Sequence, residues 1–254
     1  MVEVKNLEKS YMRNGRRIRA LRGLSLSAAP GETLGIVGES GSGKSTLLRL
    51  IACLEQADGG EVFIAGKAVG GKKTEELCLD VQMVFQDAVR SFNPRKKIRP
   101  AMDEVLKRLR GLRGPELIGE RERLIRMVGL VPELAERYPG QLSGGQCQRM
   151  AIARALAARP KVLLCDEITS ALDVSAQAQI VRLLGNLQKE FGLTVLFVSH
   201  DLALAMELCD RILVMKEGVC LETGTPEEIR KNPREAYTRE LFEAGILDTV
   251  SGET

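Results

Sequence analysis

The sequence predicts an α/β protein whose core is a parallel sheet, and two observations carry this prediction. Short apolar runs, such as VLLC at 162–165 and TVLFVS at 194–199, alternate with segments of helical period. Continuous apolar strands that are separated by helices are typical of a parallel sheet covered on both faces. Between about Pro94 and Pro160 the chain is instead arginine-rich and helical in period. We therefore expect an α/β core that is interrupted by a helical insertion.

The N-terminal part of the chain is expected to form strands in quick succession. Alternating residues or short apolar runs predict strands at 2–8, 18–28, 33–38, 60–66 and 80–86. Asn14-Gly15 between the first two strands is a strong signal for a hairpin, which indicates an antiparallel β subdomain. After the helical insertion, strands are expected at 161–167, 193–201 and 211–218, a helix at about 175–191, and a short helical tail at the end.

Size and composition indicate a soluble globular protein. The 254 residues are 44% hydrophobic and 28% charged, and the net charge of +3 is too small to indicate a nucleic-acid partner. The start of the chain lacks the pattern of a signal peptide, and no apolar run approaches the roughly 18 residues of a membrane helix. We expect a cytosolic protein without nucleic acid, which could still dock onto a membrane protein.

The cysteines are expected to be small buried side chains. None of them forms a C-x-x-C pair, so a disulfide framework or a zinc site finds no support in their spacing. The six positions are Cys53, Cys78, Cys147, Cys165, Cys209 and Cys220.

A glycine-rich loop between a predicted strand and a predicted helix indicates a nucleotide site. The stretch GESGSGKST consists of Gly38, Glu39, Ser40, Gly41, Ser42, Gly43, Lys44, Ser45 and Thr46. It matches G-x-x-x-x-G-K-[ST], in which backbone amides and a helix N-terminus hold phosphate. A helix from about Lys44 to Leu54 should follow. We expect Lys44 to reach the β and γ phosphates and the Ser45 hydroxyl to bind Mg²⁺.

Polar residues at the ends of other predicted strands complete this site. Asp166 and Glu167 end the run VLLCDE; Asp166 would hold Mg²⁺ through water, and Glu167 would activate the attacking water as general base. His200 follows TVLFVS, and we expect it to contact the γ-phosphate. Gln86 leaves the sheet at the same edge and could sense the metal or the water. The predicted catalytic residues are thus Glu167, His200 and Gln86, and the predicted metal residues are Ser45, Gln86 and Asp166.

A second phosphate-seeking loop lies about a hundred residues after the first. In QLSGGQCQR, at 141–149, a serine and two glycines precede a helical run. The first loop already binds the phosphates from one side. A second group of backbone amides could therefore bind them only from the opposite side.

The order GESGSGKS, VFQD, LSGGQ, LLCDE, SALD and SHD resembles the nucleotide-binding subunit of an ATP-binding cassette (ABC) transporter, over nearly the whole chain. The resemblance implies an ABC ATPase that binds ATP and Mg²⁺ and pairs head to tail with a second cassette. Tyr11 then resembles the aromatic residue that stacks on adenine, and Asp173 the residue that couples the two sites. The loop that would act on the partner's ATP consists of Ser143, Gly144, Gly145 and Gln146.

Three positions depart from the usual pattern of this family. Ile168 and Ala88 stand where prolines are common, and Cys147 stands where arginine is common. None of them is a phosphate, metal or water ligand, so we expect a competent site. The resemblance also implies the division of the chain: an ATPase core at 1–86 and 161–226, a helical subdomain with the signature loop at 87–160, and a C-terminal tail at 227–254.

Two stretches are similar to the family of peptide and nickel importers, QMVFQDAVRSFNPRKKI at 82–98 and NPREAYTRELFEA at 232–244. This similarity implies a peripheral subunit on the cytoplasmic face of the cell membrane, with two permease subunits, an extracytoplasmic binding protein and a second, different ATPase subunit; a homodimer remains open. Nickel or a metal chelate is slightly favoured as cargo over di- or oligopeptides. The alternative is a soluble ABC ATPase of DNA repair or of iron-sulfur assembly.

Overall fold

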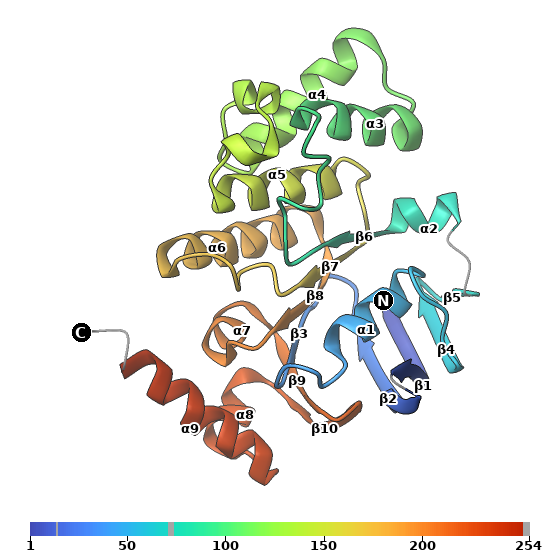
Figure 1. The fold of residues 1–254 in the computed structure, drawn as a ribbon, viewed down its shortest axis with the longest axis vertical. Helices are drawn as coiled ribbons and strands as arrows, with labels where there is room; N and C mark the ends of the chain where they lie inside the picture. The colour runs from blue at the N-terminus through green and yellow to red at the C-terminus, as the bar shows by residue number, and fades with distance from the viewer. Residues whose placement is uncertain (14, 71–73, 251–254) are drawn as a thin grey trace.

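The computed structural model describes residues 1–13, 15–70 and 74–250, with side chains up to residue 243. Its strands form two sheets (Figure 1). The larger sheet contains, in spatial order, β10 (Val219–Gly224), β9 (Arg211–Lys216), β3 (Thr33–Val37), β8 (Thr194–Ser199), β7 (Val162–Asp166) and β6 (Val81–Val84). The smaller sheet contains β2 (Arg16–Ala28), β1 (Val2–Arg13), β4 (Gly59–Ile64) and β5 (Lys67–Ala68).

The larger sheet is the parallel core that the sequence predicts. β6, β7, β8, β3 and β9 pair in parallel, and only β10 joins them in the antiparallel sense. The smaller sheet is antiparallel throughout, as expected for the N-terminal subdomain. The turn signal at Asn14 lies outside the described residues, although the strands on either side of it do pair. The predicted fold class is therefore confirmed.

Helices cover both faces of the larger sheet (Figure 1). They are α1 (Lys44–Ile51), α2 (Glu75–Asp80), α3 (Ile98–Arg110), α4 (Gly114–Met127), α5 (Gly144–Leu156), α6 (Val174–Phe191), α7 (Leu202–Leu208), α8 (Pro226–Lys231) and α9 (Ala236–Val250). Helices α3, α4 and α5 lie at one end of the molecule, and α8 and α9 lie at the other. No helix within the described ranges is long and apolar enough to cross a membrane.

Some elements were not predicted or end earlier than expected. Strand β10 escapes the sequence pattern because most of its side chains are only half-buried. Helices α2 and α7 are too short to show a clear period. Helix α1 ends at Ile51 rather than near Leu54, because Cys53 takes the left-handed conformation, with φ of 50°.

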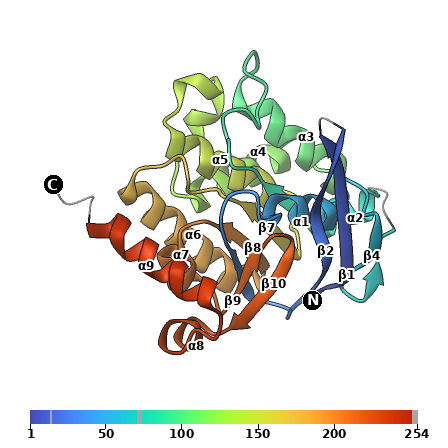
Figure 2. The same cartoon turned by 60° about the horizontal axis from the view of Figure 1, so that its bottom comes forward.

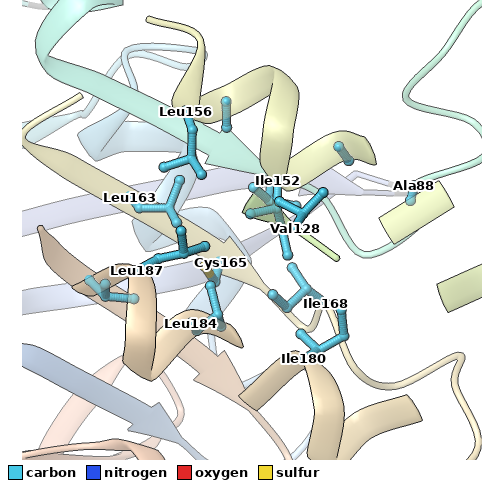
Figure 3. Close-up of a cluster of buried hydrophobic side chains, with 14 of the residues drawn as sticks. Ala88, Val128, Ile152, Leu156, Leu163, Cys165, Ile168, Ile180, Leu184 and Leu187 are labelled. Atoms are coloured by element: carbon cyan, nitrogen blue, oxygen red, sulfur yellow. The ribbon is translucent and has the colours of Figure 1, made fainter. Parts of the chain in front are cut away.

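The strands of the core sheet are apolar on both faces because each face packs against a different layer. Leu163, Cys165 and Phe197 point into one cluster with α5 and α6, whereas Leu164 and Val198 point into another with α1 and the smaller sheet. Figure 3 shows part of the first cluster. Thus the uninterrupted apolar runs of the sequence reflect a sheet that is covered on both sides.

The three departures from the family pattern are residues of this first cluster. Ile168, Ala88 and Cys147 are each at most 5% exposed, and Ile168 and Ala88 are labelled in Figure 3. Burial raises the pKa of the Cys147 thiol to about 11, so this side chain stays neutral. All three positions are therefore used for apolar packing.

Candidate nucleotide site

The glycine loop joins β3 to α1 and lies against the backbone of two other strands. Gly38 has φ of 152°, and a Cβ atom there would lie 2.1 Å from the Met215 carbonyl oxygen. Gly43 has φ of 103°, and a Cβ atom there would lie 2.3 Å from the Ala20 carbonyl oxygen. A side chain cannot fit at either position, so glycine allows the loop to lie close enough to β9 and β2.

Lys44 lies under the loop, and its side chain is only 3% exposed. Its ammonium group donates hydrogen bonds of 2.7 Å to the carbonyl oxygens of both Gly38 and Glu39, and a longer one of 3.4 Å to Ser42 Oγ. Burial lowers the pKa of Lys44, whereas the carboxylates of Glu167 and Asp166 act in the opposite direction. The ammonium thus rests on backbone carbonyls that a phosphate could replace.

The outer part of the loop is open to solvent. Glu39, Ser40 and Gly41 are exposed, Ser42 is buried, and the Thr46 side chain in α1 is half-buried. The loop amides lie next to the N-terminus of α1, where the helix dipole favours negative charge. This arrangement can accept phosphate from the solvent side.

Ser45 and Asp166 form a pair of oxygen donors beside the loop. The Ser45 hydroxyl donates a 2.7 Å hydrogen bond to Asp166 Oδ1. Burial raises the pKa of Asp166, and the hydrogen bond from Ser45 opposes that shift. Hydroxyl and carboxylate oxygens suit Mg²⁺, which usually takes one or two protein ligands together with phosphate oxygens and water. The donor set therefore fits the predicted metal.

Glu167 follows β7 in a strained conformation that directs its carboxylate toward several polar groups. Its φ is 47°, which is uncommon for a residue other than glycine, and its N–H donates to the Val198 carbonyl oxygen at 3.1 Å. Gln86 Nε2 lies 3.2 Å from Glu167 Oε2, His200 Nδ1 lies 3.8 Å from the same oxygen, and Lys44 Nζ lies 3.9 Å from Oε1. A carboxylate in this position can accept a proton from water bound near the loop.

Ser170 belongs to the same cluster but was missed by the sequence analysis. Its hydroxyl donates to the Glu167 carbonyl oxygen at 2.9 Å and accepts from Gln86 Nε2 at 3.1 Å. It thereby holds both the turn after β7 and the Gln86 amide. Its position three residues after Glu167 offered a signal, since serine often bonds the backbone of its own turn.

His200 and Tyr11 approach the loop from two different elements. His200 follows β8, and its side chain is 57% exposed, so it is free to meet a ligand. Tyr11 lies on β1, where its hydroxyl donates to the Glu55 carboxylate and also interacts with Thr46. Burial, followed by the bond to Glu55, raises the pKa of Tyr11. Tyr11 thus contacts the helix that follows the loop.

The second loop forms the N-terminus of α5. Ser143 Oγ accepts from the Gln146 N–H at 3.2 Å, and Gln146 Oε1 accepts from the Ser143 N–H at 3.1 Å, so the two residues form a capping box. Gly144 and Gly145 lie close to the start of α6, where Cβ atoms would lie 3.3 Å from Leu172 and 3.6 Å from Ala176. The amides of this helix start are therefore presented without bulky side chains.

Asp173 is the N-cap of α6 and faces the second loop across an open groove. Its carboxylate accepts from the Ala176 N–H at 2.9 Å. The groove is lined by both helix starts, including Ser143, Gly144, Gly145, Gln146 and Asp173. Two helix N-termini that meet at one groove favour a bound anion.

The structure brings the predicted site residues into two groups. In the first group, Glu167 contacts Lys44, Gln86 and His200. Its neighbour in sequence, Asp166, contacts Ser45. Ser143 to Gln146 and Asp173 line a different groove, between α5 and α6. Within one chain, the second loop therefore lines a groove that is separate from the cluster around Glu167.

Known proteins resemble this chain in sequence and in fold. The family described as ABC transporter matches residues 21–170, more than half of the chain. The chain is 44% identical over 246 residues to the oligopeptide transport ATP-binding protein OppF of Escherichia coli strain K12, covering 95% of this chain and 74% of OppF. It is 44% identical over 231 residues to the di/tripeptide transport ATP-binding protein DppF of Pseudomonas aeruginosa strain UCBPP-PA14, covering 90% and 72% of the two chains.

A solved structure of a dimer is also similar. The dimeric post-hydrolysis structure of the ATP-binding cassette MJ0796 bound to ADP and Pi superimposes with a TM-score of 0.78 at 35% identity, covering 89% of this chain and 99% of that chain. The similarity covers almost the whole of that cassette.

We predict that Gly38→Ala damages both stability and nucleotide binding, because the added methyl group would overlap the Met215 carbonyl oxygen. Gly31→Ala is the matched control: Gly31 also has positive φ, at 74°, but its nearest atom would lie 3.9 Å away. The control should lose only the roughly 1–2 kcal/mol of a left-handed alanine. Chemical denaturation and ATP titration would measure both quantities; equal losses in the two variants would contradict the prediction.

Proposed function

Because this chain belongs to the ABC transporter family and is an ATPase, we propose that it powers a membrane importer for di- or oligopeptides. The arrangement around Glu167 carries the proposal for hydrolysis, and the similarity to the oligopeptide protein OppF and the di/tripeptide protein DppF supports peptide as the cargo class. Nickel, which the sequence slightly favoured, is less supported by these relatives. They also favour transport over a soluble ATPase of DNA repair or of iron-sulfur assembly.

In the proposed mechanism, ATP binds with its phosphates on the glycine loop and its adenine on Tyr11. Lys44 exchanges the carbonyl oxygens of Gly38 and Glu39 for phosphate oxygens, which relieves the cost of keeping a buried ammonium on neutral partners. A Mg²⁺ ion at Ser45 and Asp166 would neutralise part of the phosphate charge. These groups prepare the γ-phosphate for attack.

Glu167 then takes a proton from the attacking water. The Gln86 amide, 3.2 Å from Glu167 Oε2, orients the Glu167 carboxylate. His200 lies 3.8 Å from the same Glu167 oxygen, so it would contact the γ-phosphate next to this carboxylate. Because the carboxylate lies on a turn fixed by the Val198 carbonyl and by Ser170, it needs little reorganisation to act.

The groove at Ser143 is proposed to serve the ATP of a second cassette, paired head to tail. The exposed start of α5 lines this groove and suits a phosphate group, and Asp173 at the start of α6 would then couple the two sites. We propose a heterodimer with a different ATPase subunit, two permeases and an extracytoplasmic binding protein, at the cytoplasmic face of the membrane. Residues 87–160 would move as the helical subdomain against the core at 1–86 and 161–226, with the tail at 227–254.

We predict that Glu167→Gln lowers ATP turnover by about 10² to 10⁴, the range for removal of a general base. ATP affinity should stay close to that of the wild type, because the amide keeps the size of the side chain. The control is Glu104→Gln on α3, where the side chain is 65% exposed and pairs with Arg108. Phosphate release and ATP titration measure the two effects; turnover near the wild-type rate in Glu167→Gln would remove Glu167 from this role.

Ser143→Arg is predicted to act on the partner's site. Arginine would fill the groove at the start of α5, so turnover of the assembled complex should fall at least tenfold, while the separate chain binds ATP as before. The control is Ser27→Arg, which places the same side chain on the exposed edge of β2. Normal turnover of the complex, or weaker ATP binding by the separate chain, would count against action across the dimer.

Co-purification tests the importer itself. Tagged Glu167→Gln protein, extracted from membranes in mild detergent with ATP, should bring a second cassette subunit and two proteins with several membrane spans. A second tag on the same chain would distinguish a homodimer from the proposed heterodimer. Recovery only with non-membrane partners would discard the transporter and leave the ATPase chemistry in place.

A further inference from the structure

The C-terminal helix α9 packs against α7, close to β9, the strand whose Met215 carbonyl lies against the phosphate loop. Figure 2 shows α9 on the outer side of α7 and β9. Glu222 on β10, which is 8% exposed, accepts hydrogen bonds from the N–H groups of Arg234 and Glu235 just before α9 begins. Leu241 and Phe242 pack against the main apolar cluster further along the helix. The start of α9 is therefore held in a fixed position.

Tyr237, in the first turn of α9, reaches the phosphate loop directly. The Glu39 N–H donates a 3.0 Å hydrogen bond to Tyr237 Oη, across 198 positions of sequence. The Tyr237 side chain is buried, at 5% exposure, and the ammonium group of Lys216 lies 4.1 Å from the centre of its ring. Lys216 directly follows Met215, whose carbonyl oxygen touches the loop at Gly38. The first part of the loop is thus enclosed by β9 and α9.

One peptide unit connects Tyr237 with Lys44. The N–H of Glu39 and the C=O of Gly38 belong to the same planar trans peptide, so they point in opposite directions. The N–H bonds to Tyr237, and the C=O accepts the 2.7 Å hydrogen bond from Lys44 Nζ. A rotation of this peptide would move both partners together. Fixing the N–H on Tyr237 therefore fixes the carbonyl on which the Lys44 ammonium rests.

We propose that Tyr237 is a positioning residue of the nucleotide site, which sets the Gly38–Glu39 peptide and thereby the resting place of Lys44. The inference rests on the phosphate-binding role proposed above. It makes ATP affinity depend on the Tyr237 hydroxyl of the C-terminal tail, a segment that the chemistry of hydrolysis does not otherwise use. The tail then acts on the loop through one hydroxyl group.

A purely structural role for Tyr237 would give a different result. The ring also belongs to the apolar cluster, and its loss alone would loosen α9 and lower stability. Tyr237→Phe separates the two roles, because it keeps the ring and the contact with Lys216 while it removes the oxygen. The Glu39 N–H is then left without its partner, which costs about as much as one hydrogen bond.

The experiment measures the affinity of the full chain for a non-hydrolysable ATP analogue, together with the melting temperature, in the wild type, Tyr237→Phe and Phe242→Leu. Phe242→Leu is the matched control because it weakens the packing of the same helix without touching the hydroxyl. We expect Tyr237→Phe to weaken affinity about threefold to tenfold, because the Gly38–Glu39 peptide is then no longer held in place and must be ordered when the analogue binds, at a cost of about one net hydrogen bond. Phe242→Leu should lower the melting temperature and leave affinity unchanged.

Two results would overturn the inference: unchanged affinity in Tyr237→Phe, or an equal loss of affinity in both variants, which would mean that affinity follows stability. Failure of the proposed phosphate-binding role would look different, because the wild-type chain itself would then not bind the analogue.

Discussion

The parallel alignment of β6, β7, β8 and β3 is the constraint on which the site depends. Val37 pairs with Ser199, Val198 with Asp166, and Cys165 with Val84, so the four strands end at nearly the same level. The residues that we propose to carry the chemistry follow these ends: the glycine loop, His200, Glu167 and Gln86. An antiparallel sheet would send half of these segments to the opposite edge. The buried, apolar interior of the sheet thus determines where the polar groups meet.

The strained turn after β7 shows how this arrangement is held. A left-handed glutamate persists only where its surroundings fix it, and here the Glu167 N–H is bonded to β8 while its carbonyl oxygen is bonded to Ser170. Ile168, 1% exposed, adds apolar packing directly after the strained residue. Ordinary packing and two hydrogen bonds therefore stabilise the conformation that directs the carboxylate, so the geometry that we propose for catalysis is part of the fold.

Much of this could be predicted from the sequence, because the strands are continuous apolar runs and the polar residues follow them directly. The sequence predicted that Lys44, from the glycine-loop motif, and Asp166 and Glu167, from a strand end, lie close together, and the structure places Lys44 Nζ 3.9 Å from Glu167 Oε1. The sequence could not identify contacts that depend on how distant elements dock. The hydroxyl of Tyr237 meets Glu39 across 198 positions, and only the path of β10 and α8 brings it there. Tyr237 therefore looked like part of a family ending rather than part of the site.

Contacts between distant segments also link the cluster around Glu167 to α5. Gln86 contacts Glu167, and the chain that follows it is fixed to α5 by Arg154, whose guanidinium donates to the Ser91 carbonyl oxygen at 2.8 Å and lies 4.3 Å from the centre of the Phe92 ring. Burial lowers the pKa of Arg154, which still remains charged at neutral pH because a guanidinium titrates so high. A partly buried charge of this kind is costly to separate from its partners, so residues 91 and 92 should follow α5 when it moves. Ser143 caps the start of α5. A chain of contacts therefore extends from Gln86, next to Glu167, to the second loop at Ser143. If Gln86 is displaced, we therefore expect the displacement to reach the start of α5 through residues 91 and 92 and Arg154.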